Sequence, residues 1–167
     1  MTITLAFDSF KGSLTSEEVA EAFQDGLLDI LPHCTVNKVC IADGGEGTVE
    51  ALVDTLNGEW NEAMASDPLG RNIKARYGID RHEHTAILEM ATASGLPLLT
   101  PEERNPMKTS TYGTGQLIAH AIGEGCRKFL IGIGGSATND GGTGMLRALG
   151  FRFIDKEGHE LTGGGEI

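Results

Sequence analysis

One glycine-rich segment constrains this chain more than any other: GIGGSATNDGGTG, residues 132–144. It follows the run 128–131, which favours a buried strand, and precedes the run 145–149, which favours a helix. Its glycines add no apolar area and raise the entropy cost of ordering the loop, so core packing does not explain them. At a strand-to-helix junction such a loop presents backbone N–H groups at the positive end of a helix, where proteins hold phosphate and other anions. We therefore predict an α/β fold with an anion site at this junction.

The same loop carries polar groups that can position a substrate or a hydrated metal ion. They are the backbone of Gly134 and Gly135 and the side chains of Ser136, Thr138, Asn139 and Asp140. The loop matches neither common nucleotide-binding pattern, because the chain has no Gly-Lys pair for a Walker motif and Ala137 replaces the third glycine of G-x-G-x-x-G. A tight turn with surplus glycine is the alternative interpretation. The polar side chains favour a binding loop.

The N-terminal segment has the same order of strand, polar loop and helix. Residues 3–7 form a short apolar strand, and the capping-box pair Thr15-x-x-Glu18 starts an amphipathic helix. The loop between them contains Asp8, Ser9 and the cation Lys11. Because ligands bind at the carboxyl ends of strands in open α/β sheets, this loop is a second candidate site. The alternative is a set of helix caps beside a solvated lysine.

A third loop follows the predicted strand 36–42 and precedes the predicted helix 48–56. Its sequence is Asp43-Gly44-Gly45-Glu46-Gly47. Glycines next to two carboxylates suit a metal and phosphate site or a close backbone approach. A tight turn in which Asp43 starts the helix fits the sequence equally well.

The pattern changes after residue 59. Segments 60–66 and 73–79 favour strands joined by a turn that contains proline and glycine. We place a domain boundary near this hairpin, between a first α/β lobe at 1–78 and a second lobe at 79–167. After a last predicted strand at 151–154 no helix follows, so we expect the chain to be an incomplete piece of a larger fold.

Three features in the second half of the chain can each be interpreted in two ways. Glu89 lies in an apolar strand and is either paired within a site or on an exposed face. The hydroxyl-rich segment 109–115 either forms another polar clasp or caps the predicted helix 116–123. The pair His82-x-His84 has metal-ligand spacing without a third ligand nearby, which favours a solvated turn.

Composition limits the partners and the compartment. Acidic residues outnumber basic ones by 24 to 13, and the net charge of −11 disfavours nucleic acid and anionic membranes as partners. No segment is long and apolar enough for a membrane span, and the N-terminal sequence MTITLAFDSF lacks a basic leader. The 3 cysteines form no CxxC pair, so we expect a reducing, cytoplasmic location. The sequence carries no signal for an oligomeric state.

Several long motifs occur in collinear order along the chain. They are AFDSFKGSLT (6–15), ADGGEGTVEAL (42–52), LEMATASGLPLL (88–99), NPMKTSTYGTG (105–115) and GIGGSATNDGGTGMLRALG (132–150). Together they resemble the bacterial glycerate kinase family of the glycerate 2-kinase type. Members of that family are longer, so the chain resembles their N-terminal portion. Phe7 departs from the family, which commonly has proline at this strand end.

The resemblance implies a fold and a reaction. The implied fold is α/β with two lobes, of the glycerate kinase type, and its site lies in the cleft between the lobes. The first lobe is Rossmann- or flavodoxin-like and is completed by C-terminal sequence of the longer family members. The reaction is ATP-dependent phosphorylation of D-glycerate to 2-phosphoglycerate with Mg²⁺, as part of glyoxylate metabolism. The implied partners are therefore two small molecules, D-glycerate and ATP.

Phosphoryl transfer needs N–H cradles, a cation, metal-binding carboxylates and a base for the attacking hydroxyl. The predicted catalytic residues are Lys11, which offsets phosphate charge, with Asp140 and Asp8. Asp43 and Asp140 are the metal candidates. The sequence does not rank the three carboxylates securely, but we favour Asp140 as base or metal contact because it lies in the glycine loop. The predicted substrate or phosphate-binding residues are Ser9, Asp43, Gly44, Gly45, Gly134, Gly135, Ser136, Thr138 and Asn139.

Two other functions fit the same motifs. A kinase for another small hydroxy acid or sugar acid would use the same phosphate loops, since these say little about the acceptor. A non-catalytic module could instead hold a phosphorylated metabolite for regulation.

Overall fold

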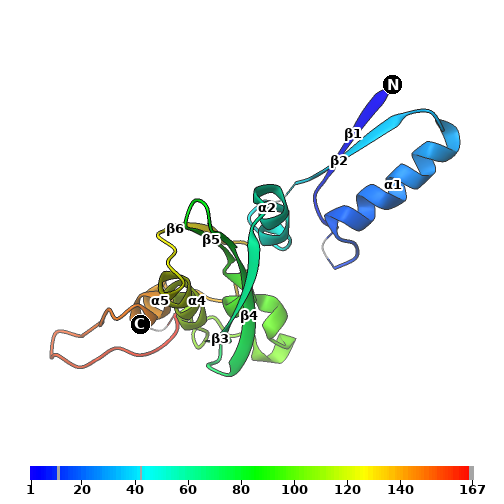
Figure 1. Ribbon diagram of the computed structural model, residues 1–167. Helices are drawn as coiled ribbons and strands as arrows, with labels where there is room; N and C mark the ends of the chain where they lie inside the picture. The colour runs from blue at the N-terminus through cyan, green and yellow to red at the C-terminus, as the bar shows by residue number, and fades with distance from the viewer. Residues whose placement is uncertain (11, 42, 166–167) are drawn as a thin grey trace.

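The computed structural model describes residues 1–10, 12–41 and 43–165, and these residues form two β-sheets. The first sheet contains the parallel strands β1 (Thr2–Phe7) and β2 (Thr35–Cys40), which α1 (Ser16–Ile30) connects. Figure 1 shows this β1–α1–β2 unit apart from the remaining elements, to which the segment before α2 (Thr48–Leu56) joins it. The predicted strand, helix and strand of the N-terminal segment are confirmed.

Helix α1 begins at the capping box that the sequence predicts. The backbone N–H of Glu18 donates to Oγ1 of Thr15 at 3.2 Å, and the N–H of Thr15 donates to Oε2 of Glu18 at 2.8 Å. The helix lies against β1, and Val19 on the helix and Leu5 on the strand are both buried. Local capping and one apolar stripe therefore suffice to explain this element.

The second sheet has the order β3-β4-β5-β6 and holds most of the core. Its strands are β3 (Glu59–Ser66), β4 (Asn72–Asp80), β5 (Thr85–Glu89) and β6 (Lys128–Gly132). The first three strands pair antiparallel, and β5 pairs with β6 in parallel. On one face α4 (Tyr112–Gly123) buries Tyr77 and Leu88, and α2 covers Ile87 on the other face. This alternation of Ile87 and Leu88 is what a strand buried on both faces requires.

Four short elements complete the described fold: α3 (Ala91–Ser94), η1 (Leu96–Leu98), η2 (Pro101–Glu103) and α5 (Thr143–Ala148). Helix α4 begins at Tyr112, earlier than the predicted residue 116. Position 113 lies within this first turn and requires glycine, because a Cβ there would lie 1.8 Å from the carbonyl oxygen of Ser66. Gly113 thus belongs to a helix that touches the end of β3, although it looks like a loop residue in the sequence.

The boundary that we predicted after residue 78 falls within β4. This strand pairs with β3 along one edge and with β5 along the other, so the sheet continues across the boundary. The two sheets of the described structure are separated instead by α2 and its flanking loops. The division into lobes at 1–78 and 79–167 stays a prediction, and it does not coincide with a break between sheets.

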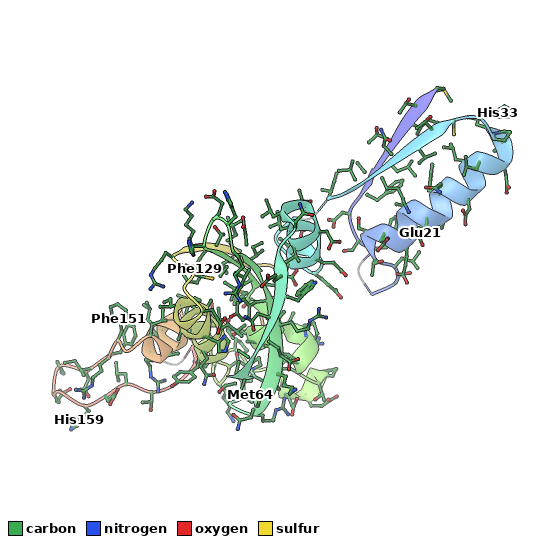
Figure 2. The ribbon with its side chains drawn as sticks, in the orientation of Figure 1. Glu21, His33, Met64, Phe129, Phe151 and His159 are labelled. Atoms are coloured by element: carbon green, nitrogen blue, oxygen red, sulfur yellow. The ribbon has the colours of Figure 1, made fainter. Side chains whose placement is uncertain are left out.

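The prediction of a strand at 151–154 is wrong. Residues near it form only an isolated bridge between Ile154 and Glu160, and no longer strand lies beside them in the described part of the chain. Figure 1 shows an extended arm after α5, and Figure 2 shows Phe151 and His159 projecting from it. An apolar run becomes a strand only where a partner strand accepts its hydrogen bonds. Within residues 1–10, 12–41 and 43–165, no helix has the length and apolar character to cross a membrane.

Candidate functional site

Two glycine loops that are 90 residues apart in sequence lie in direct backbone contact. The N–H of Gly134 donates to the carbonyl oxygen of Gly44 at 2.9 Å. A Cβ at position 132 would lie 2.6 Å from that oxygen, and a Cβ at position 134 would lie 2.6 Å from Cα of Gly45. Only glycine permits this approach, so the close-backbone interpretation of loop 43–47 is the one that the structure supports.

The contact lies at the carboxyl ends of the two parallel strands. Glu89, the last residue of β5, is in register with Gly132, the last residue of β6. Helix α2 begins at the same place, and Figure 1 shows it next to the β5–β6 edge. Loops at this edge are where open α/β sheets bind their ligands.

Glu89 is paired and buried, which decides between the two interpretations of this residue. The residue is 8% exposed, and its Oε1 accepts a hydrogen bond from the N–H of Val49 at 2.9 Å. Burial raises the pKa of the Glu89 carboxyl above its ordinary value, and backbone hydrogen bonds from Val49 and Thr48 oppose that rise. We did not place Glu89 among the site residues. The signal in the sequence was a single carboxylate inside an apolar strand.

Asp140 sits between the starts of α4 and α5 and is 6% exposed. Its Oδ2 accepts the N–H of Thr111 at 2.8 Å and the N–H of Gly144 at 3.2 Å. Its Oδ1 accepts the N–H of Gly142 at 3.0 Å, and the hydroxyl of Thr111 approaches both oxygens at 2.9–3.0 Å. The carboxylate therefore takes up the N–H groups of Gly142 and Gly144 at the C-terminal end of the predicted anion loop, together with that of Thr111.

These contacts favour an anchoring role for Asp140. A base or a metal ligand needs an oxygen that can face the substrate or the ion, and both oxygens here are engaged by protein donors. The catalytic and metal roles of Asp140 stay predictions that the hydrogen bonds do not favour. The residue instead joins loop 140–144 to the segment before α4.

The middle of the glycine loop is partly free. Gly44, Gly45 and Gly134 each donate their N–H inside the protein, to Thr48, Asp43 and Gly44 respectively. By contrast, the N–H groups of Gly135 and Ser136 donate to no residue that the structure describes. The hydroxyls of Ser136 and Thr138 lie 3.0 Å apart, and Asn139 is exposed. Of the predicted phosphate loop, Gly135 and Ser136 thus have backbone N–H groups that no described residue accepts, whereas Ala137 and Thr138 donate within the protein.

A cavity of about 560 Å³ lies between the loop after β1 and the start of α2. Its lining includes Asp8 and Ser9 on one side and Glu46 and Glu50 on the other. Asp8 is exposed, and its Oδ1 accepts the N–H of Ser9 at 2.7 Å. Lys11 lies outside the described residues. The cavity therefore brings two of the predicted residues to the α2 loop, and its described lining does not reach Asp43 or loop 134–140.

The described residues contain no group of three His, Cys, Asp or Glu side chains that could hold a metal ion. Mg²⁺ commonly uses only one or two carboxylates, with water and substrate phosphates completing its shell. Asp43 fits that limited role, because it is exposed and only its Oδ1 is engaged, by the N–H of Gly45 at 2.9 Å. Asp140 does not fit it, for the reason given above.

Glycine loops that meet at the carboxyl ends of parallel strands define an α/β protein with its candidate site at one edge of the second sheet. Comparison with known proteins makes the class specific: the model of the glycerate kinase family matches residues 3–167. The chain belongs to the glycerate kinase family.

Named relatives agree with this assignment. The chain is 48% identical over 165 residues to a glycerate kinase of Bacillus subtilis (strain 168) and 47% identical over 165 residues to a glycerate 2-kinase of Escherichia coli (strain K12). Each alignment covers 99% of this chain and 43% of the relative. A crystal structure assigned as glycerate kinase 2 of Salmonella typhimurium LT2 superposes with a TM-score of 0.81 at 47% identity, covering 99% of this chain and 44% of that one. The chain thus spans less than half the length of these relatives.

Proposed function

We propose that the full-length protein transfers the γ-phosphoryl group of ATP to a hydroxyl of D-glycerate and releases 2-phosphoglycerate and ADP. The observation that carries the proposal is the family match across residues 3–167, with relatives that are named glycerate kinase and glycerate 2-kinase. Unused N–H donors at Gly135 and Ser136 support it, because phosphoryl transfer depends on donors aimed at phosphate oxygens.

In this proposal the cavity holds the acceptor. The glycerate hydroxyl oxygen forms the new bond to phosphorus, the bond from phosphorus to the bridging oxygen of ATP breaks, and Asp8 takes the hydroxyl proton. Ser9 binds a second substrate oxygen, and both residues line the same cavity. Lys11 offsets negative charge on the phosphates, as the sequence predicts.

The glycine loops hold the donor. Backbone N–H groups of Gly135 and Ser136, with the side chains of Thr138 and Asn139, bind phosphate oxygens. Gly44, Gly45 and Gly134 contribute the close backbone contact that fixes the loop. Asp43 would hold Mg²⁺, which when bound neutralises charge on the β- and γ-phosphates.

Turnover by the full-length protein tests the proposal. We expect ADP release that requires both ATP and D-glycerate, with phosphorus NMR placing the new ester on the 2-hydroxyl. A panel of hydroxy acids and sugar acids should be slower by kcat/KM than D-glycerate. If another acid is preferred, that acid replaces D-glycerate as the proposed substrate. If ADP forms only at the background rate with every acid, the kinase proposal fails and a non-catalytic binding module becomes the supported function.

A further inference from the structure

Hydrogen bonds join the start of α2 to the ends of β5 and β6, and the first of them is made by Glu89. The carboxylate accepts the N–H of Val49 at 2.9 Å, and the next residue, Met90, donates its N–H to Gly132 at 2.9 Å. On the other side, Oγ1 of Thr48 accepts the N–H of Gly44 at 3.1 Å. The carbonyl of Gly44 then accepts the N–H of Gly134, which connects loop 43–47 to the loop after β6.

Glu89 supplies what α2 lacks locally. The N-cap residue Gly47 has no side chain to accept the first helical N–H groups, and no side-chain cap is present there. A helix start without a cap leaves unsatisfied donors, which costs stability when they are buried. The carboxylate of Glu89 takes this role from a strand that is 40 residues further along the chain.

We propose that Glu89 is a positioning residue for phosphoryl transfer, which holds loop 43–47 against loop 132–135 by capping α2. The inference rests on the proposed function for its catalytic consequence. Glu89 is not part of the described cavity lining, and its Oε1 is engaged by the backbone N–H of Val49 in α2, so in this proposal it acts through the loops. Its effect on the reaction is geometric, because small displacements of oriented groups lower the rate of the chemical step.

The chain offers a matched control at the opposite end of the same sheet. Asp80 ends β4, is also 8% exposed, and accepts the N–H groups of His82 and Glu83 at 2.9 and 3.1 Å. It therefore caps a backbone turn, whereas Glu89 caps a helix, and it lies far along the strands from the glycine loops. Loss of either carboxylate removes a buried acceptor, and only one of them faces the candidate site.

The test compares Glu89→Met, Glu89→Gln and Asp80→Ala in the full-length protein. In Glu89→Met we expect kcat with D-glycerate and ATP to fall by about tenfold or more while KM changes by less than about threefold. Amide hydrogen exchange in segments 43–49 and 132–135 should accelerate in the same variant. Glu89→Gln keeps one acceptor oxygen and should lie between Met and wild type. Asp80→Ala should leave both the kcat and the exchange of these segments near wild type, whatever its melting temperature.

Two results would overturn the inference. One is wild-type exchange of both segments in Glu89→Met, which would show that the carboxylate does not hold the loops. The other is an equal loss of kcat and loop protection in Asp80→Ala, which would assign the effect to general sheet stability. If wild type does not turn over D-glycerate, the proposed function fails, while the exchange measurement still decides whether Glu89 holds the loops.

Discussion

The contact between the two glycine loops depends on single hydrogen atoms at Gly132 and Gly134. At position 134 the nearest groups are backbone atoms of Gly45, which cannot move as a flexible side chain would. Glycine here is required by proximity. The same residue type at Gly26, in the exposed middle of α1, has no neighbour within 4 Å of a built Cβ.

Gly134→Ala should therefore destabilise the protein, by about 1–3 kcal/mol, because the methyl group forces the loops apart. Gly26→Ala should instead be neutral or stabilise by up to about 1 kcal/mol, since alanine favours a helix interior. Denaturant unfolding of both variants measures the two changes. Equal stability of Gly134→Ala and wild type would contradict the backbone contact between the loops.

Asp140 and Asp8 differ in burial, and this difference separates an anchor from a reactive group. Asp140→Asn puts an amide donor where Oδ2 now accepts backbone N–H groups, so we expect a loss of about 2–3 kcal/mol in unfolding free energy. Asp8→Asn changes an exposed carboxylate and should alter stability by less than about 0.5 kcal/mol, while lowering kcat/KM by about 100-fold. Unfolding curves and steady-state kinetics on the same pair of variants check both statements. An Asp140→Asn protein as stable as wild type would return Asp140 to the catalytic candidates.

At the scale of elements, α1 shows how much a local signal determines. Its capping box was visible in the sequence and is present in the structure. The backbone N–H of Thr15, and then its hydroxyl, lower the pKa of the Glu18 carboxyl. Because this pKa is lower in the folded protein, the ionised Glu18 carboxylate stabilises the fold at pH values above its ordinary pKa of 4.5. That contribution is lost as the pH falls through the lowered pKa.

Thr15→Ala should lower the free energy of unfolding by about 1 kcal/mol at neutral pH. The difference from wild type should shrink in acid, because a protonated Glu18 no longer completes the capping box. Denaturant unfolding at neutral and acidic pH measures both values. Ser13→Ala is the control, since its hydroxyl donates to no residue that the structure describes. A difference between Thr15→Ala and wild type that is constant with pH would contradict the capping box as the cause.

Elements with local signals were predictable, and those that depend on distant partners were not. The α2 prediction at 48–56 matches the helix Thr48–Leu56, and the hairpin of β3 and β4 follows from alternation and a turn. The strand predicted at 151–154 has no partner strand among the described residues, and the first turn of α4 includes Gly113, which packs against Ser66. Propensity and pattern do not contain these tertiary contacts.

At the scale of the whole molecule, the site depends on contacts that no single segment reveals. The sequence predicted glycine loops after β2 and β6, but these strands belong to different sheets, and β6 pairs with β5. The sequence offered a close backbone approach for loop 43–47 without naming loop 132–134 as the partner, and it did not predict that Asp140 accepts backbone N–H groups of Thr111, Gly142 and Gly144. Both facts follow from how α2 and α4 pack on the sheet. Side chains that satisfy one another across the fold cannot be recognised from spacing alone.

The two sheets differ in size, and their stabilities should differ accordingly. The β1–α1–β2 unit has two strands and one helix, whereas the second sheet has four strands with helices on both faces. A two-stranded sheet is marginal in water because it buries little apolar area, while Ile87 and Leu88 on β5 are each 1% exposed. In the 167-residue chain, amides of β1 and β2 should therefore exchange with solvent at least about tenfold faster than those of β4 and β5. Native-state hydrogen exchange measures both sets in one sample. Equal protection of the two sheets would show that the N-terminal unit unfolds only with the rest, and that its size does not set its stability.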